Sequence, residues 1–448
     1  MRQGNAVAPM LFIIVFLLAG GSQAEEELTL KEAVNTALKE NNQVKAKVWS
    51  VESRRSDKEI ARSHLLPRIT FEERFSRTNN PTYAFMAKLN QERFQSSDFA
   101  VDSLNDPDVI DNFMTVVSLE QPLYVRKAQV AFDMAGREVM ASELELQRTK
   151  ERVGFDVFQA CVQVMIAREY ETVAHKGLED VREHQRIAEV RSEAGLGLYS
   201  DVLRARVAKA EAERAVVEAE KNAKVAGKLL GILIGKGEPV AVAPESVPVF
   251  SLSPYEVYQE ASRKRADLKA TESRYDTAQK GVKLAEADYF PVLGVGGSYQ
   301  LDDHDNPFGA EGESWQVMAF LRVTLFDGLN RENQRAKAFR QAREAGEYLE
   351  GMKKQIDYEI YEAYLSVQEA EKKQALANAA AESAEEGMRL TSKRYENALV
   401  PLVSLLDAQA SLDRARADVV AMRGQYLTAL ARLEFVSGRL LQALEIKN

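Results

Sequence analysis

The sequence contains little cysteine and few aromatic residues, and both shortages restrict what the protein can be. Its single cysteine, Cys161 among 448 residues, rules out an intrachain disulfide framework and a cysteine metal site. Because Cys161 lies in an apolar, helix-like stretch, we expect a buried side chain rather than a reactive thiol. Aromatic residues make up only 8% of the chain, and this composition favours long helices over compact cores.

The residue patterns that carry catalysis, metal binding or nucleic-acid binding are also missing. The net charge is −9 and no basic run is present, so we expect no nucleic-acid surface. The glycines at 294, 296 and 297 fall inside a predicted strand, which excludes a dinucleotide site. No nucleophile and base stand in a recognisable pattern, and we therefore expect no enzyme, no catalytic residue and no cofactor.

Metal sites are not expected from the spacing of the histidines. The four histidines, His64, His175, His184 and His304, are scattered along the chain and match no metal-ligand spacing. The acidic segment 302–306 could bind calcium at an exposed surface, although an exposed polar loop explains its composition more simply. We therefore predict no metal site.

Long hydrophobic runs are absent apart from one at the N-terminus. The apolar run 10–19 follows Arg2, and Ser22 and Ala24 provide a small-x-small cleavage site before Glu25. These features predict a signal peptide over 1–24, without a cysteine for lipid attachment. The alternative is a membrane anchor, but the run has about ten residues whereas a spanning helix needs roughly 20. We expect the mature chain to lie outside the inner membrane.

One apolar seam is present twice in the chain. Near the C-terminus, apolar residues recur at alternating steps of three and four, which predicts a long helix packed against a partner helix. The seam comprises Leu405, Ala408, Leu412, Ala415, Val419, Met422, Tyr426, Ala429, Leu433, Val436 and Leu440. Subtracting 203 from the positions up to Val436 gives a matching set in which only Lys209 is polar: Val202, Ala205, Ala212, Val216, Ala219, Ala223, Ala226, Leu230 and Leu233. The same helix is therefore encoded twice.

The rest of the chain follows the same duplication. The first repeat, 25–238, contains a predicted helix over 28–64, a strand pair within 69–123 separated by a polar loop over 79–112, a long helix over 126–194 and a helix over 201–234. A short irregular or strand-like insert covers 239–253. The second repeat, 254–448, contains a helix over 254–288, a strand pair within 292–326, a long helix over 330–397 and a helix over 402–441.

The predicted strands have the pattern of membrane strands. Each has about ten residues, apolar on one side and polar on the other, as a strand crossing a bilayer in a barrel requires. Four strands cannot close a barrel, because the smallest known need about eight, and open edges are not tolerated in lipid. Several chains would therefore share one barrel. The alternative is a pair of surface hairpins on a soluble coiled-coil protein.

The long helices carry dense charge and belong in water. Each of the two longest is roughly 100 Å long at 1.5 Å per residue, enough to cross a periplasm-like space. The simplest arrangement is a tube with a barrel at one end, helical hairpins along its wall, and tight helix breaks at the far end.

Several motifs, in this order and duplicated, resemble those of the TolC family of outer membrane efflux proteins. They are Leu30-Lys31-Glu32-Ala33-Val34, Arg265-Ala266-Asp267-Leu268-Lys269, Tyr289-Phe290-Pro291, Leu325-Phe326-Asp327-Gly328, and the helix breaks around 194–202 and 395–408. The resemblance implies a mainly helical homotrimer, with four strands per chain in a twelve-stranded outer-membrane barrel and duplicated hairpins forming a periplasmic tunnel. It also implies a passive exit duct that docks a periplasmic adaptor and an inner-membrane pump of the RND or ABC type, in drug or metal efflux or in type I secretion.

The resemblance also suggests roles for residues at the two helix breaks. Gly195, Leu196, Asp201 and Leu399 correspond to adaptor-contacting tips, and Tyr395, Ser404 and Asp407 correspond to the gate region. Some family members place two aspartates after the second break, and here Asp407 matches one whereas Ser404 replaces the other. Three copies of Asp407 around a narrow lumen would attract cations. The alternative is a solvated carboxylate near a helix start, where negative charge is favourable in any case.

The competing class is a periplasmic coiled-coil adaptor or a structural tether of an export machine. Such an adaptor would carry one hairpin and glycine-rich β domains, usually with an inner-membrane anchor. This chain has two predicted hairpins and two strand pairs with lipid-type faces, which favours the outer-membrane duct.

Overall fold

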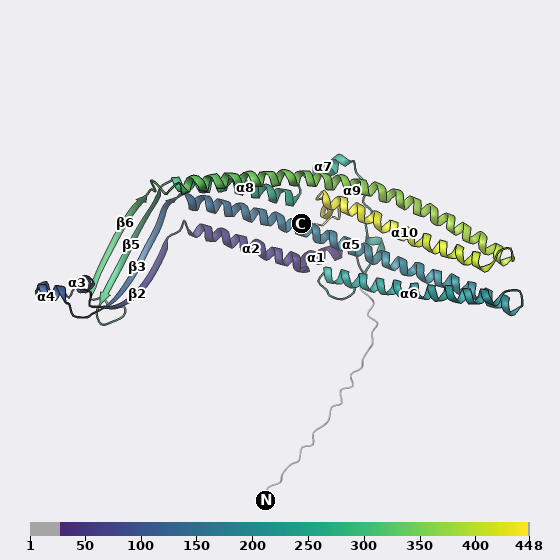
Figure 1. The fold of residues 1–448 in the computed structure, drawn as a ribbon, viewed down its shortest axis with the longest axis horizontal. Coiled ribbons are helices and arrows are strands. Elements are labelled where there is room, and N and C mark those ends of the chain that lie inside the picture. Colours follow the sequence, from purple (N-terminus) through teal and green to yellow (C-terminus); the bar gives the residue numbers. More distant parts are fainter. Residues whose placement is uncertain (1–26, 447–448) are drawn as a thin grey trace, which may run out of the picture.

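Long helices extend from one end of a four-stranded sheet in the computed structural model, which describes residues 27–446 (Figure 1). The predicted signal peptide lies outside the described residues. The first half contains β1 (Glu27–Leu28), α1 (Leu30–Glu40), α2 (Asn42–Ser63), β2 (Arg68–Thr78), α3 (Pro81–Asn90), α4 (Val101–Asn105), β3 (Ile110–Val125), α5 (Arg126–Glu193) and α6 (Tyr199–Leu233). The second half contains β4 (Ala241–Val242), α7 (Tyr255–Ser262), α8 (Ala266–Glu286), β5 (Val292–Asp303), β6 (Gly312–Arg322), α9 (Asn330–Glu396), α10 (Leu402–Val436) and α11 (Leu440–Ala443).

The duplication is visible in the two helical hairpins. Helices α6 and α10 have 35 residues each, and their first residues differ by the predicted offset, 402 − 199 = 203. Helix α5 packs against α6 and α10, and α10 packs against α9. The four helices therefore lie side by side in the order α6, α5, α10, α9, as Figure 1 shows.

The two copies of the apolar seam are buried differently. In α6 the predicted positions are the buried ones, including Val202, Ala205, Val216 and Leu230. In α10 the predicted Leu405, Leu412, Leu433 and Val436 near the two ends are buried, but in the middle of the helix the buried positions lie beside the predicted seam, at Val420, Gly424 and Leu427. The burial differs because the two helices have different numbers of neighbouring helices. Helix α6 packs mainly against α5, whereas α10 packs against both α5 and α9.

Two predicted helices are each divided into two. The predicted helix 28–64 breaks at Asn41, whose extended backbone ends α1 and whose side chain accepts a hydrogen bond from Gln43 N–H to start α2. The expected capping box of Thr29 and Glu32 is present. The predicted helix 254–288 likewise breaks after Ser262. The first interruption results from local capping by Asn41, which an apolar pattern does not record. At the second, no side-chain hydrogen bond caps the start of α8.

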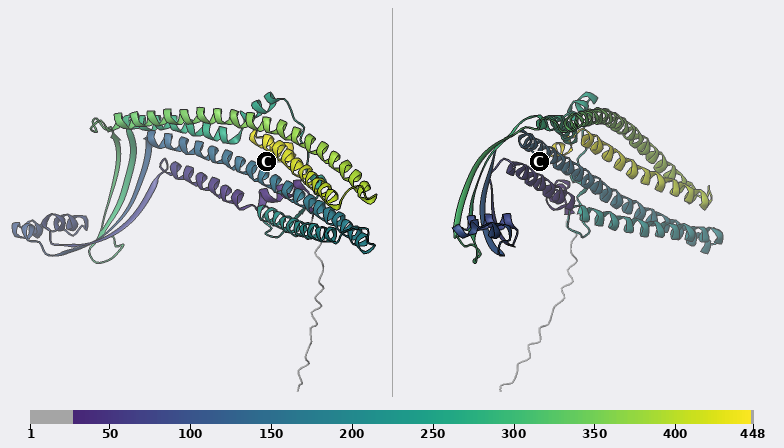
Figure 2. Two further views of the ribbon diagram at one scale, coloured as in Figure 1. Left: turned by 45° about the vertical axis from the view of Figure 1, so that its right-hand side comes forward. Right: turned by 60° about the vertical axis from the view of Figure 1, so that its left-hand side comes forward.

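The four strands form one antiparallel sheet in the order β2, β3, β5, β6. Strand β6 ends at Arg322, whereas the sequence pattern predicted strand to 326. Figure 2 shows the sheet curving away from the helices, with α3 and α4 at its far end.

The polar segment 79–112, expected to be a loop, is largely folded, and this expectation was wrong. It contains α3, a short 3₁₀ turn over Ser96–Phe99, and α4. Asn80 caps α3 through a hydrogen bond from Tyr83 N–H, and Pro81 occupies the first turn. Asparagine before proline is a helix-start pattern as well as a turn pattern, so the sequence did contain a helix signal here.

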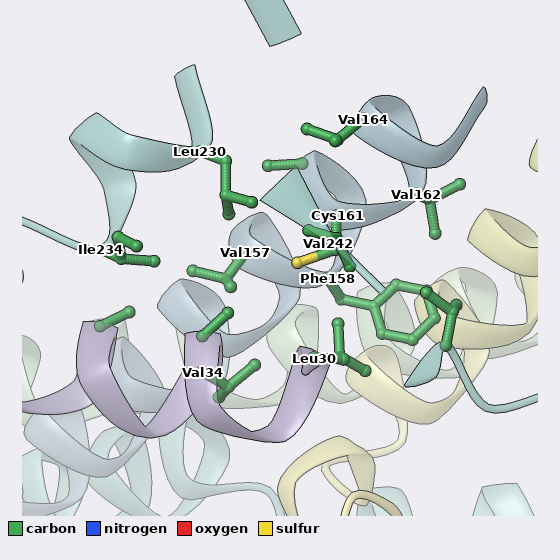
Figure 3. Close-up of a cluster of buried hydrophobic side chains, with 14 of the residues drawn as sticks. Leu30, Val34, Val157, Phe158, Cys161, Val162, Val164, Leu230, Ile234 and Val242 are labelled. Atoms are coloured by element: carbon green, nitrogen blue, oxygen red, sulfur yellow. The ribbon is translucent and has the colours of Figure 1, made fainter. Parts of the chain in front are cut away.

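A core near the middle of the molecule holds the hairpins to the N-terminal helices (Figure 3). Leu30 and Val34 of α1 pack against Val157 and Phe158 of α5 and Leu230 of α6. The short parallel pair of β1 and β4 closes this core.

Cys161 lies inside the same core, as predicted. Burial raises the pKa of its thiol to about 12, which keeps the thiol protonated and unreactive.

Candidate functional site

The register of the sheet sorts its side chains into two chemically different faces. Register pairs place Ile69 opposite Leu119 and Phe71 opposite Val117, and they continue the apolar face through Tyr299 to Trp315 on the other strands. The large side chains of this face are exposed, and they include Ile69, Phe71, Phe75, Val117, Leu119, Tyr299, Trp315, Val317 and Leu321. We call this surface the apolar face of the sheet.

The opposite face is mainly polar. It carries Thr70, Glu72, Arg74, Ser76, Asn112, Ser118, Glu120, Ser298, Gln300, Asp302 and Gln316. Among the described residues, β2 pairs only with β3, and β6 only with β5. A sheet with one apolar exposed face and two free edges suits lipid only when further strands cover those edges.

Glu73 places a charge among the apolar side chains of this face, between Phe71 and Phe75 on β2, and the structure shows how it is covered. Its carboxylate accepts hydrogen bonds from the Thr115 hydroxyl and, at 3.4 Å, from the Phe308 N–H. Phe308 also stacks on Phe71, with ring centroids 6.1 Å apart. The loop between β5 and β6 thus folds over this carboxylate.

The two helix breaks at the opposite end of the molecule have the same turn geometry. After α5, Leu196 N–H donates to Arg191 C=O and Gly195 N–H donates to Ser192 C=O. After α9, Leu399 N–H donates to Arg394 C=O and Ala398 N–H donates to Tyr395 C=O. This pair of bonds is the Schellman motif, which requires a left-handed residue just past the helix. Gly195 has φ +72° and Ala398 has φ +58°.

The second break therefore contains a strained residue that the first avoids. We expect Ala398→Gly to stabilise the second hairpin by roughly 0.5–1 kcal/mol, because glycine adopts positive φ freely. The matched change Gly195→Ala should destabilise the first hairpin by about 1 kcal/mol. Amide hydrogen exchange at 190–200 and 393–403 measures both effects, and unchanged exchange in both variants would contradict the strain.

Large apolar side chains are exposed at both breaks. Leu196 is 80% exposed and Leu399 is 73% exposed, and Leu198 and Tyr199 are exposed beside them. Asp201 lies in the first turn of α6 without capping it, because Leu198 is the N-cap. We call residues 194–201 and 397–401 the hairpin tips.

Arg191 connects the two hairpins just beside the tips, although no local pattern in the sequence marks it. Its guanidinium donates to the carbonyl oxygens of Tyr395 at 2.8 Å and Glu396 at 3.1 Å, and lies 4.7 Å from the centre of the Tyr395 ring. A cation at a helix C-terminus satisfies unpaired carbonyls and the helix dipole. The first hairpin thereby caps the last turn of α9.

The three gate candidates lie at different depths. Tyr395 is only 5% exposed and packs with Leu402 and Leu405 in an apolar cluster beneath the tips, so its ring does not face an open space. Ser404 is half-buried in the first turn of α10 and Asp407 is exposed one turn later. Asp407 has no ion pair among the described residues.

A buried polar network lies farther along α10, where α5 crosses it. Gln409 Oε1 is 3.2 Å from His184 Nε2, and Gln409 Nε2 donates to Asp413 Oδ1 at 2.9 Å. Burial raises the pKa of the Asp413 carboxyl. Asp413 also packs over Gly177, where a Cβ would lie 3.2 Å from its carboxylate oxygen. This network and Arg191 are two polar connections between the hairpins.

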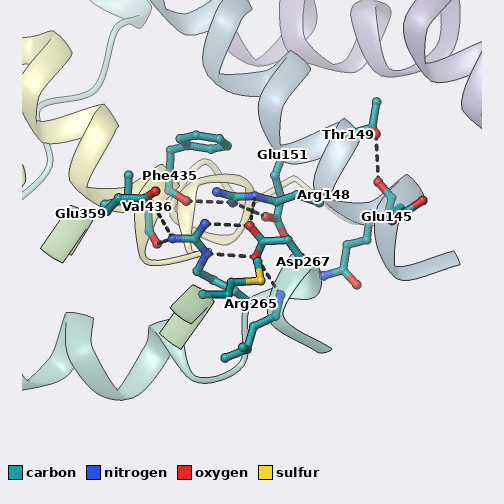
Figure 4. A network of polar contacts seen from close by, with 12 residues as sticks. Glu145, Arg148, Thr149, Glu151, Arg265, Asp267, Glu359, Phe435 and Val436 are labelled. Carbon is teal, nitrogen blue, oxygen red and sulfur yellow. Dashed lines mark hydrogen bonds and ion pairs between the residues drawn. The ribbon is translucent and has the colours of Figure 1, made fainter. Parts of the chain in front are cut away.

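A second buried network, centred on Arg265, holds four helices together near the middle of the molecule (Figure 4). Arg265 donates to Asp267 at 2.7 and 3.0 Å, to Glu359 at 2.9 Å and to the Val436 carbonyl oxygen at 3.0 Å. Arg148 of α5 lies 3.3 Å from Asp267. Burial opposes ionisation of Asp267, but the two arginines outweigh it and hold its pKa below the usual value.

Two groups of side chains have metal-ligand chemistry in three dimensions that linear spacing did not predict. Glu171, His175 and Glu220 form one on the first hairpin, and Asp303, His304 and Glu311 form the other in the β5–β6 loop. In the second, His304 Nδ1 already lies 2.6 Å from a Glu311 oxygen. The prediction of no metal site remains a prediction.

Comparison with known proteins identifies the family to which this combination of sheet and paired hairpins belongs. It matches the family described as outer membrane efflux protein over residues 33–236 and 257–439. The chain belongs to the outer membrane efflux protein family. The match covers both repeats, as the motifs in the sequence predicted.

Individual relatives agree with this assignment. Alkaline protease secretion protein AprF of Pseudomonas aeruginosa is 23% identical over 431 residues, which cover 93% of this chain and 85% of AprF. Pyoverdine export outer membrane protein OpmQ of the same organism is 24% identical over 430 residues, which cover 90% of this chain and 82% of OpmQ.

Solved structures confirm the fold. The CmeC outer membrane channel of Campylobacter jejuni has a TM-score of 0.76 at 17% identity and covers 98% of this chain and 94% of its own. The outer membrane protein VceC of Vibrio cholerae has a TM-score of 0.73 at 18% identity and covers 93% of this chain and 95% of its own.

Family membership decides several of the sequence-based predictions. This outer membrane efflux protein is an exit duct of the outer membrane that extends into the periplasm, and it is not an enzyme. The family functions together with adaptor and pump components, which favours the duct over the adaptor or tether. None of the described helices is long and apolar enough to cross a membrane.

Proposed function

We propose that three copies of this chain form one continuous conduit, in which the sheet of each copy supplies a third of a twelve-stranded barrel. The observation that carries this proposal is the sheet itself: its apolar face is exposed and its edge strands β2 and β6 lack an outer partner among the described residues. Pairing β6 of one copy with β2 of the next would cover every edge, and a closed barrel needs that.

The helices of each copy would continue the barrel as a periplasmic tunnel. Helices α5 and α9 have 68 and 67 residues, which correspond to roughly 100 Å. The hairpin tips at its far end would dock a periplasmic adaptor and, through it, an inner-membrane pump of the RND or ABC type. Gly195, Leu196, Asp201 and Leu399 are the proposed contacts, because exposed leucines on tight turns provide apolar anchors.

The substrate class follows from the relatives only in outline. One relative is named for secretion of a protease and another for export of pyoverdine. We infer that this duct conducts passively whatever its pump delivers.

Trimer formation is tested by purification from outer-membrane fractions in detergent, followed by electrophoresis of heated and unheated samples. A conduit should fractionate with the outer membrane and migrate as a trimer that heat converts to monomer. A monomer that remains soluble without detergent would overturn the proposal.

We further propose that the helix ends next to the hairpin tips form the gate. Arg191 would hold it closed, and Asp407 and Ser404 would line it. Replacing Arg191 with glutamine removes two charge-assisted hydrogen bonds and the contact with the Tyr395 ring. Such bonds are worth about 1.5–3 kcal/mol each, and every 1.4 kcal/mol changes an equilibrium about tenfold. The open fraction in planar bilayers should therefore rise on the order of tenfold or more.

Arg186 provides the matched control for this experiment. It lies on the same helix and pairs with Glu183 in an exposed position, so Arg186→Gln should leave conductance unchanged. As a single substitution that keeps Arg191, Asp407→Asn should reduce the channel's preference for cations over anions. Equal conductance of Arg191→Gln and wild type would reject the role of Arg191 as a closing contact.

A further inference from the structure

The folded segment between β2 and β3 covers the polar face of the sheet at its outer end. Gln91, just after α3, donates through its amide nitrogen to Asn112 Oδ1 at 2.8 Å and to the Asp111 carbonyl oxygen at 2.8 Å. Asn112 donates onward to Asp302 Oδ1 at 2.9 Å. Asn112 and Asp302 belong to the polar face, yet Asp302 is only 1% exposed. The segment therefore removes this part of the polar face from solvent.

The same segment reaches the remaining strands. At Gly312, the first residue of β6, an added Cβ would lie 1.8 Å from the Asn90 carbonyl oxygen. A pocket between α3 and β2 is lined by Tyr83 and Met86 on one side and by Arg74 and Ser76 on the other. Arg74, Ser76, Asn112, Asp302 and Gly312 all share the polar face. The covered surface thus extends across all four strands.

Internal contacts maintain the shape of this segment. Phe94 lies between Phe85 and Phe99, with ring centroids 4.9 and 5.0 Å apart in edge-to-face geometry. Lys88 pairs with Asp98 at 2.9 Å. The Gln95 N–H and Lys88 hold the pKa of Asp98 below its usual value. A segment with its own aromatic cluster and ion pair is a built element rather than a loose loop.

We propose that residues 80–108 form an inward-folded cap that limits the size of molecules passing the outer mouth of the pore. The proposal rests on the trimeric conduit proposed above, in which the polar face lines the lumen. Three copies of a helix seated on that face would narrow the exit from every side. Gln91 is the positioning residue, because its amide joins the cap to the wall.

Access of a thiol reagent from outside the cell tests the cap. Ser298 lies on the polar face, and Ser298→Cys introduces a reporter within the proposed lumen. The chain's own Cys161 is buried and should not react. We would treat intact cells with a small and a large membrane-impermeant maleimide, using the full chain and a variant in which residues 80–108 are replaced by a short Gly-Ser linker. The large reagent should label the capless variant severalfold faster, and the small reagent should label both at similar rates.

Two further variants keep the result interpretable. Gln91→Glu removes the amide donor and places a negative charge against the Asn112 amide oxygen and the Asp111 carbonyl oxygen, so it should raise labelling by the large reagent without a deletion. Val317→Cys lies on the apolar face and should remain unlabelled in every background. Equal labelling of capped and capless Ser298→Cys by the large reagent would overturn the cap alone. Labelling of Val317→Cys with Ser298→Cys unreactive would overturn the conduit and the cap together.

Discussion

Replacing Arg265 with alanine is expected to destabilise the protein by about 3–5 kcal/mol, the cost of breaking a buried ion pair. The guanidinium is 5% exposed and joins α8, α9 and the end of α10 through four hydrogen bonds. Its removal leaves the Val436 carbonyl oxygen and part of two carboxylates without their donor. Denaturant unfolding in detergent, followed by circular dichroism, measures the loss.

The matched control is Arg335→Ala. Arg335 also joins two helices, pairing with Glu286 at 2.9 Å, but both side chains are exposed. Exposed ion pairs contribute about 0–1 kcal/mol, so this variant should unfold close to wild type. Equal destabilisation of the two variants would show that the buried network has no special role.

The same network gives a pH dependence of known sign. The folded-state pKa of Asp267 lies below its ordinary value of 3.8. Its contribution is therefore complete above that value and is lost as the pH falls through the lower folded-state pKa. Burial raises the pKa of Glu151, so the contribution of Glu151 to stability changes with pH in the opposite direction. The stability difference between wild type and Asp267→Asn should be constant at neutral pH and shrink below about pH 4. A difference that grew on acidification would contradict the arginine contacts.

Placing arginine at Val317 is expected to be nearly as damaging, but only if the apolar face contacts lipid. Val317 is 75% exposed near the middle of β6. An arginine on the lipid face of a membrane strand costs about 2–4 kcal/mol at the midplane. We therefore expect Val317→Arg to yield much less heat-modifiable trimer in the outer membrane.

The neighbouring residue tests which side of the sheet faces lipid. Gln316 precedes Val317 on the same strand and points to the polar face, so Gln316→Arg should assemble normally. The two substitutions add the same side chain at nearly the same depth and differ only in direction. Normal assembly of Val317→Arg, or failure of both variants, would contradict the assignment of the two faces.

Periodicity in the sequence was enough to predict the main elements. Helices α6 and α10 carry their seam at helical spacing, and the strands alternate, because each pattern is set by the geometry of one element alone. The direction of the alternation also predicted which strand residues would share a face. The alternation also excludes a register shift by one residue, because such a shift would turn the apolar side chains toward the polar face. The register itself came from the structure.

Contacts between distant segments could not be predicted in the same way. Arg191 and Tyr395 are 204 positions apart, and Arg265 meets the Val436 carbonyl oxygen across 171 positions. Neither contact produces a periodic pattern in the sequence, because each is formed by a single arginine side chain and a single backbone oxygen. The capping asparagines Asn41 and Asn80 did leave local patterns, but each pattern also fits a turn.

The sequence by itself determined that this protein has two copies of a helix–strand–helix unit with lipid-compatible strands, because those properties depend on spacing along one element. Only the tertiary structure decided which positions in the middle of α10 are buried, that residues 80–108 fold over the polar face, and which arginines connect the helices. Those outcomes depend on how many neighbours each element has, and neighbours are chosen by the assembled fold rather than by local sequence.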